Sequence, residues 1–173
     1  QIAPAFRVAV GDHYGLQKGR SVMGKIVNAL HRMGFDEVYD TSFSADLTIM
    51  EEANELLVRL GKGDLKDRPM FTSCCPGWIN YCETFQSDFL DNLSSCKSPQ
   101  QMFGAMVKTF LSEKEGIPAE KIVVVSAMPC TAKKGELSRD YQNAAGVPDV
   151  DFSLTTREVA HMIQKAKILP LNS

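Results

Sequence analysis

The sequence has no long hydrophobic run and no excess of charge of one sign. No stretch of its 173 residues is apolar over the roughly 20 positions that a membrane-spanning helix needs. The net charge of −2 provides no basic surface for nucleic acid or for an anionic membrane. We therefore expect no nucleic-acid partner and no membrane insertion.

The first residues also lack the features of a targeting segment. Residues 1–5 contain neither a basic region nor an apolar run, so we expect no signal peptide. There is no initiating methionine, and we expect the chain to begin inside a longer protein. With 44% hydrophobic and 23% charged residues, the composition is globular, and 173 residues suit one domain or one lobe of a larger one.

Cysteine pairs of the C-x-x-C type are absent too. The five cysteines are Cys74, Cys75, Cys82, Cys96 and Cys130. An odd count in a chain of this length disfavours a disulfide framework and favours reduced thiols in a reducing compartment. Because structural zinc sites usually carry local C-x-x-C pairs, their absence favours iron–sulfur chemistry over zinc.

Apolar β-branched runs alternate with helical patterns along the chain. Runs typical of strands cover residues 6–10, 36–40, 69–73 and 121–127. Helical periodicity covers five segments, the fourth with a capping box from Ser98 to Gln101: residues 21–33, 45–60, 76–85, 98–114 and 156–167. This order predicts an α/β fold with a mostly parallel, twisted sheet and helices on both faces.

Two cysteine loops follow predicted strands at equivalent places. The first, residues 72–78, reads Thr-Ser-Cys-Cys-Pro-Gly-Trp, and the second, residues 128–136, reads Met-Pro-Cys-Thr-Ala-Lys-Lys-Gly-Glu. Ligands of open α/β sheets bind beyond the carboxyl ends of the strands. Cys75 precedes a predicted helix whose free N–H groups favour a thiolate, the form that binds soft metals. A shared thiolate site is therefore predicted. The alternative is that each cysteine is a small buried hydrophobe, as an isolated cysteine more often is.

Together the two loops resemble the first and second signatures of iron-only (FeFe) hydrogenases. Residues 3–5, 46–52 and 98–100 also match the usual sequence of that family. The resemblance implies that residues 1–173 form the N-terminal lobe of a two-lobed catalytic domain. It implies an enzyme that reversibly oxidises H2 to protons and electrons in an anaerobic compartment. We expect this compartment to be the cytoplasm, with an organelle or the periplasm left open.

The family's active H-cluster is a 4Fe–4S cubane joined through a cysteine sulfur to a two-iron subcluster with CO, cyanide and a bridging amine dithiolate. By resemblance, Cys75 and Cys130 bind the cubane, and Cys74 is the proton donor that faces the bridging amine. The resemblance also implies a cyanide hydrogen bond from one lysine and apolar contacts from three further residues: Lys133, Met128, Ala3 and Pro4.

The predicted helix at residues 45–60 has a polar stripe formed by Glu52, Glu55 and Arg59. On pattern alone, the favoured reading is a solvated face with an i,i+4 ion pair between Glu55 and Arg59. The resemblance instead implies a proton relay from Cys74 through the following residues to the surface: Glu52, Ser94, Glu55 and Arg59.

The sequence departs from the family at the third signature, E-x-M-A-C-x-x-G-C, which is absent. That signature supplies the other two cubane ligands, so the chain offers two of four. We expect the rest from a C-terminal lobe or a second chain, and electron exchange with a carrier such as ferredoxin or a cytochrome. Two alternatives are a non-catalytic iron–sulfur or sensory relative, and an inactive fragment.

Overall fold

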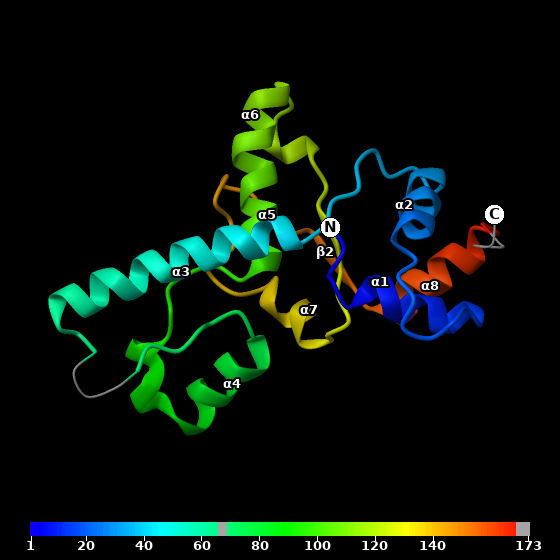
Figure 1. Ribbon diagram of the computed structural model, residues 1–173. Helices are drawn as coiled ribbons and strands as arrows, with labels where there is room; N and C mark the ends of the chain where they lie inside the picture. The colour runs from blue at the N-terminus through cyan, green and yellow to red at the C-terminus, as the bar shows by residue number, and fades with distance from the viewer. Residues whose placement is uncertain (66–68, 169–173) are drawn as a thin grey trace.

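Two short parallel strands form the centre of the molecule. The computed structural model describes residues 1–65 and 69–168 (Figure 1). Strand β1 (Val125–Ala127) pairs in parallel with β2 (Phe152–Leu154), with Ser126 opposite Ser153. Parallel pairing of strands with helices in between confirms the α/β class with a small parallel sheet.

The N-terminal segment extends this sheet on the other side of β1. Ile2 forms parallel bridges with both Ala127 and Asp40. Its N–H donates to the Tyr39 carbonyl at 2.9 Å, and its own carbonyl accepts from the Thr41 N–H at 3.0 Å. Residues from three distant parts of the chain therefore lie side by side, although only two segments qualify as strands in the described part.

Helices account for most of the remaining described residues, and five of them confirm predicted helices. These are α2 (Met23–Arg32), α3 (Ser42–Lys62), α4 (Pro76–Phe85), α5 (Pro99–Met106) and α8 (Thr156–Lys165). The shorter helices are α1 (Phe6–Ala9), η1 (Val10–Tyr14), η2 (Ser87–Asn92), the π-helical η3 (Val107–Leu111), α6 (Ser112–Glu115), η4 (Ala119–Lys121) and α7 (Ala132–Glu136).

Three of the four predicted strands are wrong. Residues 6–10 form α1 and the start of η1, because Phe6 and Val10 stand four positions apart and bury one helical face completely. Residues 36–40 and 69–73 contribute one isolated bridge each, at Asp40 and Phe71. The fourth strand was predicted over residues 121–127 and is formed only by residues 125–127. The sequence also missed β2, which is too short to show a period.

The capping box predicted at the start of α5 is only half formed. Ser98 Oγ accepts from the Gln101 N–H at 3.4 Å, but the buried Gln101 side chain has no hydrogen-bond partner among the described residues. A complete capping box begins α8 instead, where Thr155 and Glu158 exchange hydrogen bonds.

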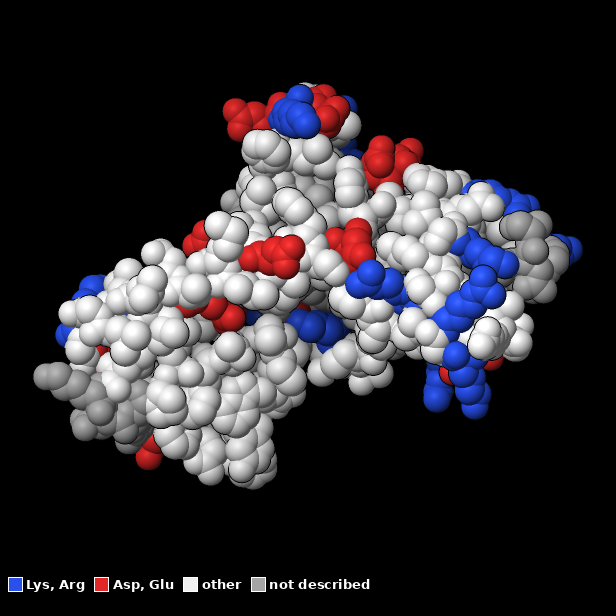
Figure 2. Space-filling model, in the orientation of Figure 1, with Lys and Arg blue, Asp and Glu red and all other residues white. Residues whose placement is uncertain are grey.

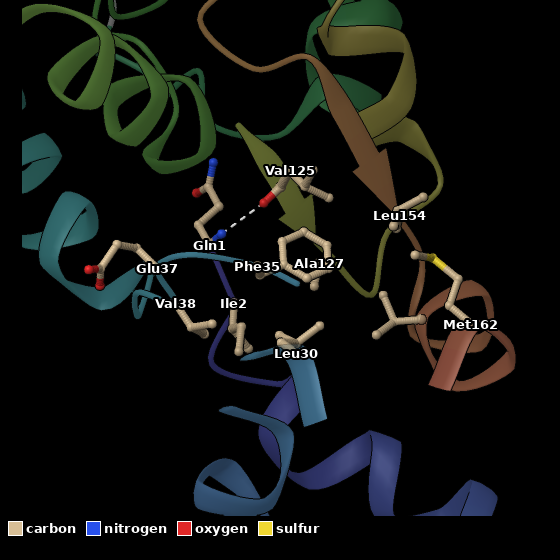
Figure 3. Close-up of a pocket in the computed structure, with 11 residues that line it drawn as sticks. Gln1, Ile2, Leu30, Phe35, Glu37, Val38, Val125, Ala127, Leu154 and Met162 are labelled. Atoms are coloured by element: carbon tan, nitrogen blue, oxygen red, sulfur yellow. Dashed lines mark hydrogen bonds between the residues drawn. The ribbon is translucent and has the colours of Figure 1, made fainter. Parts of the chain in front are cut away.

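The main hydrophobic core lies where the N-terminal segment, α2 and α8 meet the end of β1. Phe6, Ile26 and Ile163 are fully buried in it. At its edge a small apolar pocket of about 30 Å³ lies between the N-terminal segment, β1 and α8, where the Gln1 backbone nitrogen donates to the Val125 carbonyl at 2.8 Å (Figure 3). None of the predicted site residues lines this pocket.

Helix α3 buries polar residues and exposes apolar ones, which is the opposite of an ordinary surface helix. Its polar residues Ser44 and Thr48 are buried, whereas Ile49 and Leu57 are 64% and 68% exposed. It packs against α5 at one end and extends outward as a long rod (Figure 1). The visible surface over α4 carries few charged side chains, whereas several acidic and basic side chains lie along α3 (Figure 2). The apolar face of α3 that contains Ile49 and Leu57 has no partner in the described part of the molecule.

Candidate iron–sulfur site and proton path

The two cysteine loops lie against each other. Cys75 is the N-cap of α4, which begins at Pro76 as predicted. Lys133, in the first turn of α7, donates from Nζ to the backbone carbonyl of Cys74 at 2.8 Å. Helices α4 and α7 also pack together. Segments some 60 residues apart are therefore in contact, although the strand predicted before the first loop is not formed.

The thiols of this site differ in accessibility. Cys75 and Cys130 are exposed, and Cys74 is half-buried. Exposed thiols on facing loops suit a soft metal centre such as an iron–sulfur cluster. Among the described residues, however, no group of three or more His, Cys, Asp or Glu could hold a metal ion. The donor set therefore fits a cluster chemically but supplies only part of its ligands.

The remaining cysteines are unsuited to complete the set. Cys82 is fully buried within α4. Burial, followed by the nearby carboxylates of Glu52 and Glu51, raises the pKa of the Cys96 thiol to about 11. A raised pKa disfavours the thiolate, which is the form that binds metals.

The apolar residues predicted around the cluster occupy different surroundings. The Ala3 N–H donates to the Ala127 carbonyl at 3.0 Å, and the Met128 N–H donates to Leu154 at 2.8 Å. Ala3 and Met128 are both buried in the main core. Pro4 is exposed, and its carbonyl accepts from Arg7 Nε at 3.1 Å. The N-terminal segment therefore lies along β1, directly beside the start of the second cysteine loop.

Lys133 belongs to a buried hydrogen-bond network that the sequence did not reveal. Its Nζ lies 3.0 and 3.1 Å from the carboxylate oxygens of Glu136. Gln100 Nε2 donates to Glu136 at 2.8 Å, and Gln100 Oε1 accepts from Ser126 at 2.8 Å and Ser153 at 3.2 Å. The signals available were the place of Gln100 in a family-like segment and the i,i+3 spacing of Lys133 and Glu136.

Hydrogen bonds join three of the five residues predicted for the proton relay. Ser94 Oγ donates to Glu55 at 2.6 Å, and Arg59 Nη2 donates to Glu55 at 2.7 Å. Burial alone would raise the pKa of Glu55, but the donors Ser94, Ser95 and Arg59 outweigh it and hold the pKa below its ordinary value. The predicted i,i+4 ion pair between Glu55 and Arg59 is confirmed, but the stripe on α3 faces the protein rather than solvent.

Glu52, the next residue of the predicted relay, is poorly satisfied. Its Oε1 is buried and has no hydrogen-bond partner among the residues that the structure describes. A buried carboxylate oxygen in this condition needs a proton, a water molecule or a further group.

A cavity of about 300 Å³ lies beside the first cysteine loop. Its walls include Ser73 and Pro76 of the first cysteine loop, Ser94 of the predicted relay, and Glu136. A space of this size, with several polar side chains in its walls, has room for water molecules. The first cysteine loop, the relay serine and the Lys133 network therefore border one common space.

Comparison with known proteins identifies the family. The chain matches the family described as iron only hydrogenase large subunit, C-terminal domain, over residues 1–172, and it belongs to this family. It is 53% identical over 172 residues to the NADP-reducing hydrogenase subunit HndD of Solidesulfovibrio fructosivorans, covering 97% of this chain and 29% of that protein. It is 45% identical to iron hydrogenase 1 of Clostridium pasteurianum, covering 96% of this chain and 29% of that protein.

A solved structure and a further relative agree with this assignment. A structure of an [FeFe]-hydrogenase that reveals stepwise H-cluster assembly has a TM-score of 0.91 and 46% identity, over 99% of this chain and 42% of that one. The cytosolic Fe–S cluster assembly factor narfl of Danio rerio is also similar, with 34% identity over 96% of this chain and 42% of that protein. The chain thus spans less than half the length of each of these relatives.

Proposed function

We propose that this chain supplies one half of the catalytic site of an [FeFe] hydrogenase, which interconverts H2 with two protons and two electrons. The observation that carries the proposal is the direct contact between the two cysteine loops, from Lys133 Nζ to the Cys74 carbonyl. Hydrogenase relatives at 45–53% identity support it.

Cys75 and Cys130 are the residues that would hold the 4Fe–4S part of an H-cluster. Thiolates are the usual ligands of such clusters, and four are needed. The other two ligands would come from outside these 173 residues, on a C-terminal lobe or a second chain. In this proposal residues 1–173 are the N-terminal lobe of the catalytic domain.

When bound, the H-cluster supplies the redox chemistry that splits or forms H2. The chain's own residues move the protons. The Cys74 thiol would exchange a proton with Glu52, whose buried Oε1 has no other partner in the described residues. Ser94 would pass it on, because a hydroxyl both donates and accepts: here it donates to Glu55 and accepts from the Cys96 N–H. Arg59 would end the path near the surface.

Other residues would shape the site. Lys133 would donate to a cyanide ligand, and Ala3, Pro4 and Met128 would form an apolar wall that excludes water. Electrons would pass to a carrier such as ferredoxin or a cytochrome in a reducing, anaerobic compartment, for which we favour the cytoplasm. No helix in residues 1–65 and 69–168 is long and apolar enough to cross a membrane.

A second candidate is a non-catalytic role in iron–sulfur cluster assembly or sensing. It is favoured by the 34% identity to an Fe–S assembly factor over 96% of the chain. The two candidates differ at Cys74, because a cluster that is only carried needs no proton donor beside it.

The test uses the complete protein loaded with its cluster. Cys74→Ser should keep the infrared bands of CO and cyanide but lose most H2 turnover, because a serine hydroxyl is a far weaker acid. Cys75→Ala should instead lose cluster iron. The proposal fails if the wild-type protein carries iron without CO and cyanide bands, which would favour the second candidate.

A further inference from the structure

The ammonium group of Lys133 is held from two sides. One N–H reaches the Cys74 carbonyl at 2.8 Å, and a second lies between the two carboxylate oxygens of Glu136 at 3.0 and 3.1 Å. A lysine ammonium carries three N–H donors, so one donor remains for another acceptor. The Lys133 side chain is 13% exposed, and it lies at the border between the buried network and the cysteine loops.

Glu136 is itself fixed by the central sheet. Its side chain is 6% exposed, and a carboxylate buried to this extent requires strong partners. Gln100 supplies one from Nε2, at 2.8 Å, and donates to the Lys133 carbonyl as well, at 3.2 Å. Ser126 on β1 and Ser153 on β2 both donate to its Oε1. The Gln100 amide cannot turn over without loss, because its oxygen would then face the Glu136 carboxylate and the Lys133 carbonyl, which only accept.

We propose that Glu136 is a positioning residue: anchored to the sheet through Gln100, it holds the Lys133 ammonium beside Cys74 with one N–H free to donate to an anionic ligand of the cluster. The inference rests on the proposed function, because it requires a cluster at the cysteine loops. It adds a chain of contacts from the sheet to the ligand: Ser126 and Ser153 orient Gln100, Gln100 orients Glu136, and Glu136 places Lys133.

The neighbouring ion pair provides a matched control. Lys134 and Glu158 pair at 2.5 Å, but their side chains are 43% and 44% exposed. Removing the carboxylate of Glu158 therefore frees the adjacent lysine without disturbing the buried network. An effect that is specific to Glu136 separates positioning of Lys133 from a general loss of one Lys–Glu pair.

The experiment compares Glu136→Gln, Glu136→Asp and Glu158→Gln in the complete protein loaded with its cluster. Infrared spectra of wild-type protein first establish the CO and cyanide bands. We expect the cyanide bands of Glu136→Gln to shift, since the uncompensated and less restrained ammonium changes its hydrogen bond to the ligand. Glu136→Asp keeps the charge and should give a smaller shift, and Glu158→Gln should give none.

A second measurement does not require the protein to be loaded with the cluster. In a crystal structure of the apo protein, Lys133 Nζ should leave the Cys74 carbonyl in Glu136→Gln and stay within hydrogen-bond distance in Glu158→Gln. Unchanged cyanide bands, or an unmoved Lys133 in apo Glu136→Gln, would overturn the inference. Absence of cyanide bands from the wild-type protein would instead contradict the proposed function, so the two failures are distinguishable.

Discussion

At the scale of single residues, neighbours in sequence have opposite surroundings. Gln100 and Gln101 are 1% and 0% exposed, yet among the described residues the first makes hydrogen bonds with both ends of its amide and the second with neither. Burial of an amide without partners costs about 1–3 kcal/mol, whereas a satisfied amide in a network contributes to a unique arrangement.

This contrast gives a paired prediction on stability. Gln101→Met keeps the volume and removes two unsatisfied atoms, so the apo protein should gain about 1 kcal/mol. Gln100→Met should lose about 2–4 kcal/mol, because Glu136, Ser126 and Ser153 lose partners. The urea-unfolding midpoint measures both. Equal destabilisation by the two changes would mean that bound water satisfies Gln101.

The relay is tested at Glu52. Glu52→Gln keeps the size of the side chain but removes the titratable group. H2 evolution should fall by roughly 10²-fold with intact infrared bands of the loaded protein. Glu51→Gln alters an exposed neighbour outside the hydrogen-bonded stripe and should stay near wild-type activity. If both variants retain full activity, α3 carries no protons.

At the scale of elements, the sequence predicted long periodic helices well and strands poorly. Five helices were correct because their periodicity extends over several turns, and α4 matched at both ends because Pro76 marks its start. Three predicted strands were wrong because a five-residue apolar run such as residues 6–10 satisfies helical and strand periods equally. Tertiary contacts decide between them, and these are absent from a local pattern.

The same limit applies to the site. The cysteine loops and the stripe on α3 are local patterns, so the sequence singled out their residues, while their roles stay predictions from the family resemblance. Glu136 and Gln100 lie 36 residues apart, and only the fold brings their side chains together. The sequence also could not show which face of α3 is buried, since its apolar side faces outward in this part of the protein.

Helix α5 approaches the segment before β2 too closely for any side chain at Gly104. A Cβ there would lie 2.2 Å from the Asp149 carbonyl oxygen. Gly104→Ala should therefore destabilise the protein by about 1–3 kcal/mol. Gly24→Ala is the control, because nothing lies within 4 Å of a Cβ at that position of α2. It should be neutral or stabilising by up to about 1 kcal/mol. Thermal unfolding distinguishes them.

The capping box of α8 predicts a dependence on pH. The hydrogen bond from Lys134, with help from the Thr155 N–H, lowers the pKa of Glu158 from 4.5 to about 2. A lowered pKa stabilises the fold above the unfolded value, and this contribution is lost as pH falls from 4.5 towards 2. Because Glu158 is exposed, we expect only about 0.5–1 kcal/mol.

The measurement compares wild type with Glu158→Gln in urea at several pH values. The difference in unfolding free energy should be largest near pH 6 and should shrink through that acid range. A difference that is constant with pH would show that the charge of Glu158 does not contribute. Glu120→Gln, at an exposed position of η4, serves as the control.

At the scale of the whole molecule, the number of cluster ligands and the exposed apolar face of α3 both suit a molecule with a further partner segment. Two exposed thiols leave a cubane two ligands short, and α3 exposes Ile49, Met50, Leu57 and Leu60 at 56–69%. Exposed apolar faces of this kind mark interfaces. Both features motivate the proposal that a further segment would cover this part of the molecule and complete the site.

The last prediction tests both features together. Expressed alone with the cluster-building machinery, residues 1–173 should hold no stable H-cluster, show no H2 activity and self-associate. Co-expressed with a C-terminal segment that carries the third signature, they should bind that segment and gain iron, CO and cyanide bands. Leu57→Glu places a charge on the apolar face and should prevent co-purification, since burial of a leucine contributes about 1.5–3 kcal/mol. Leu57→Met, which keeps the face apolar, should bind normally. Activity from residues 1–173 alone would contradict the ligand count, and normal binding of Leu57→Glu would place the interface elsewhere.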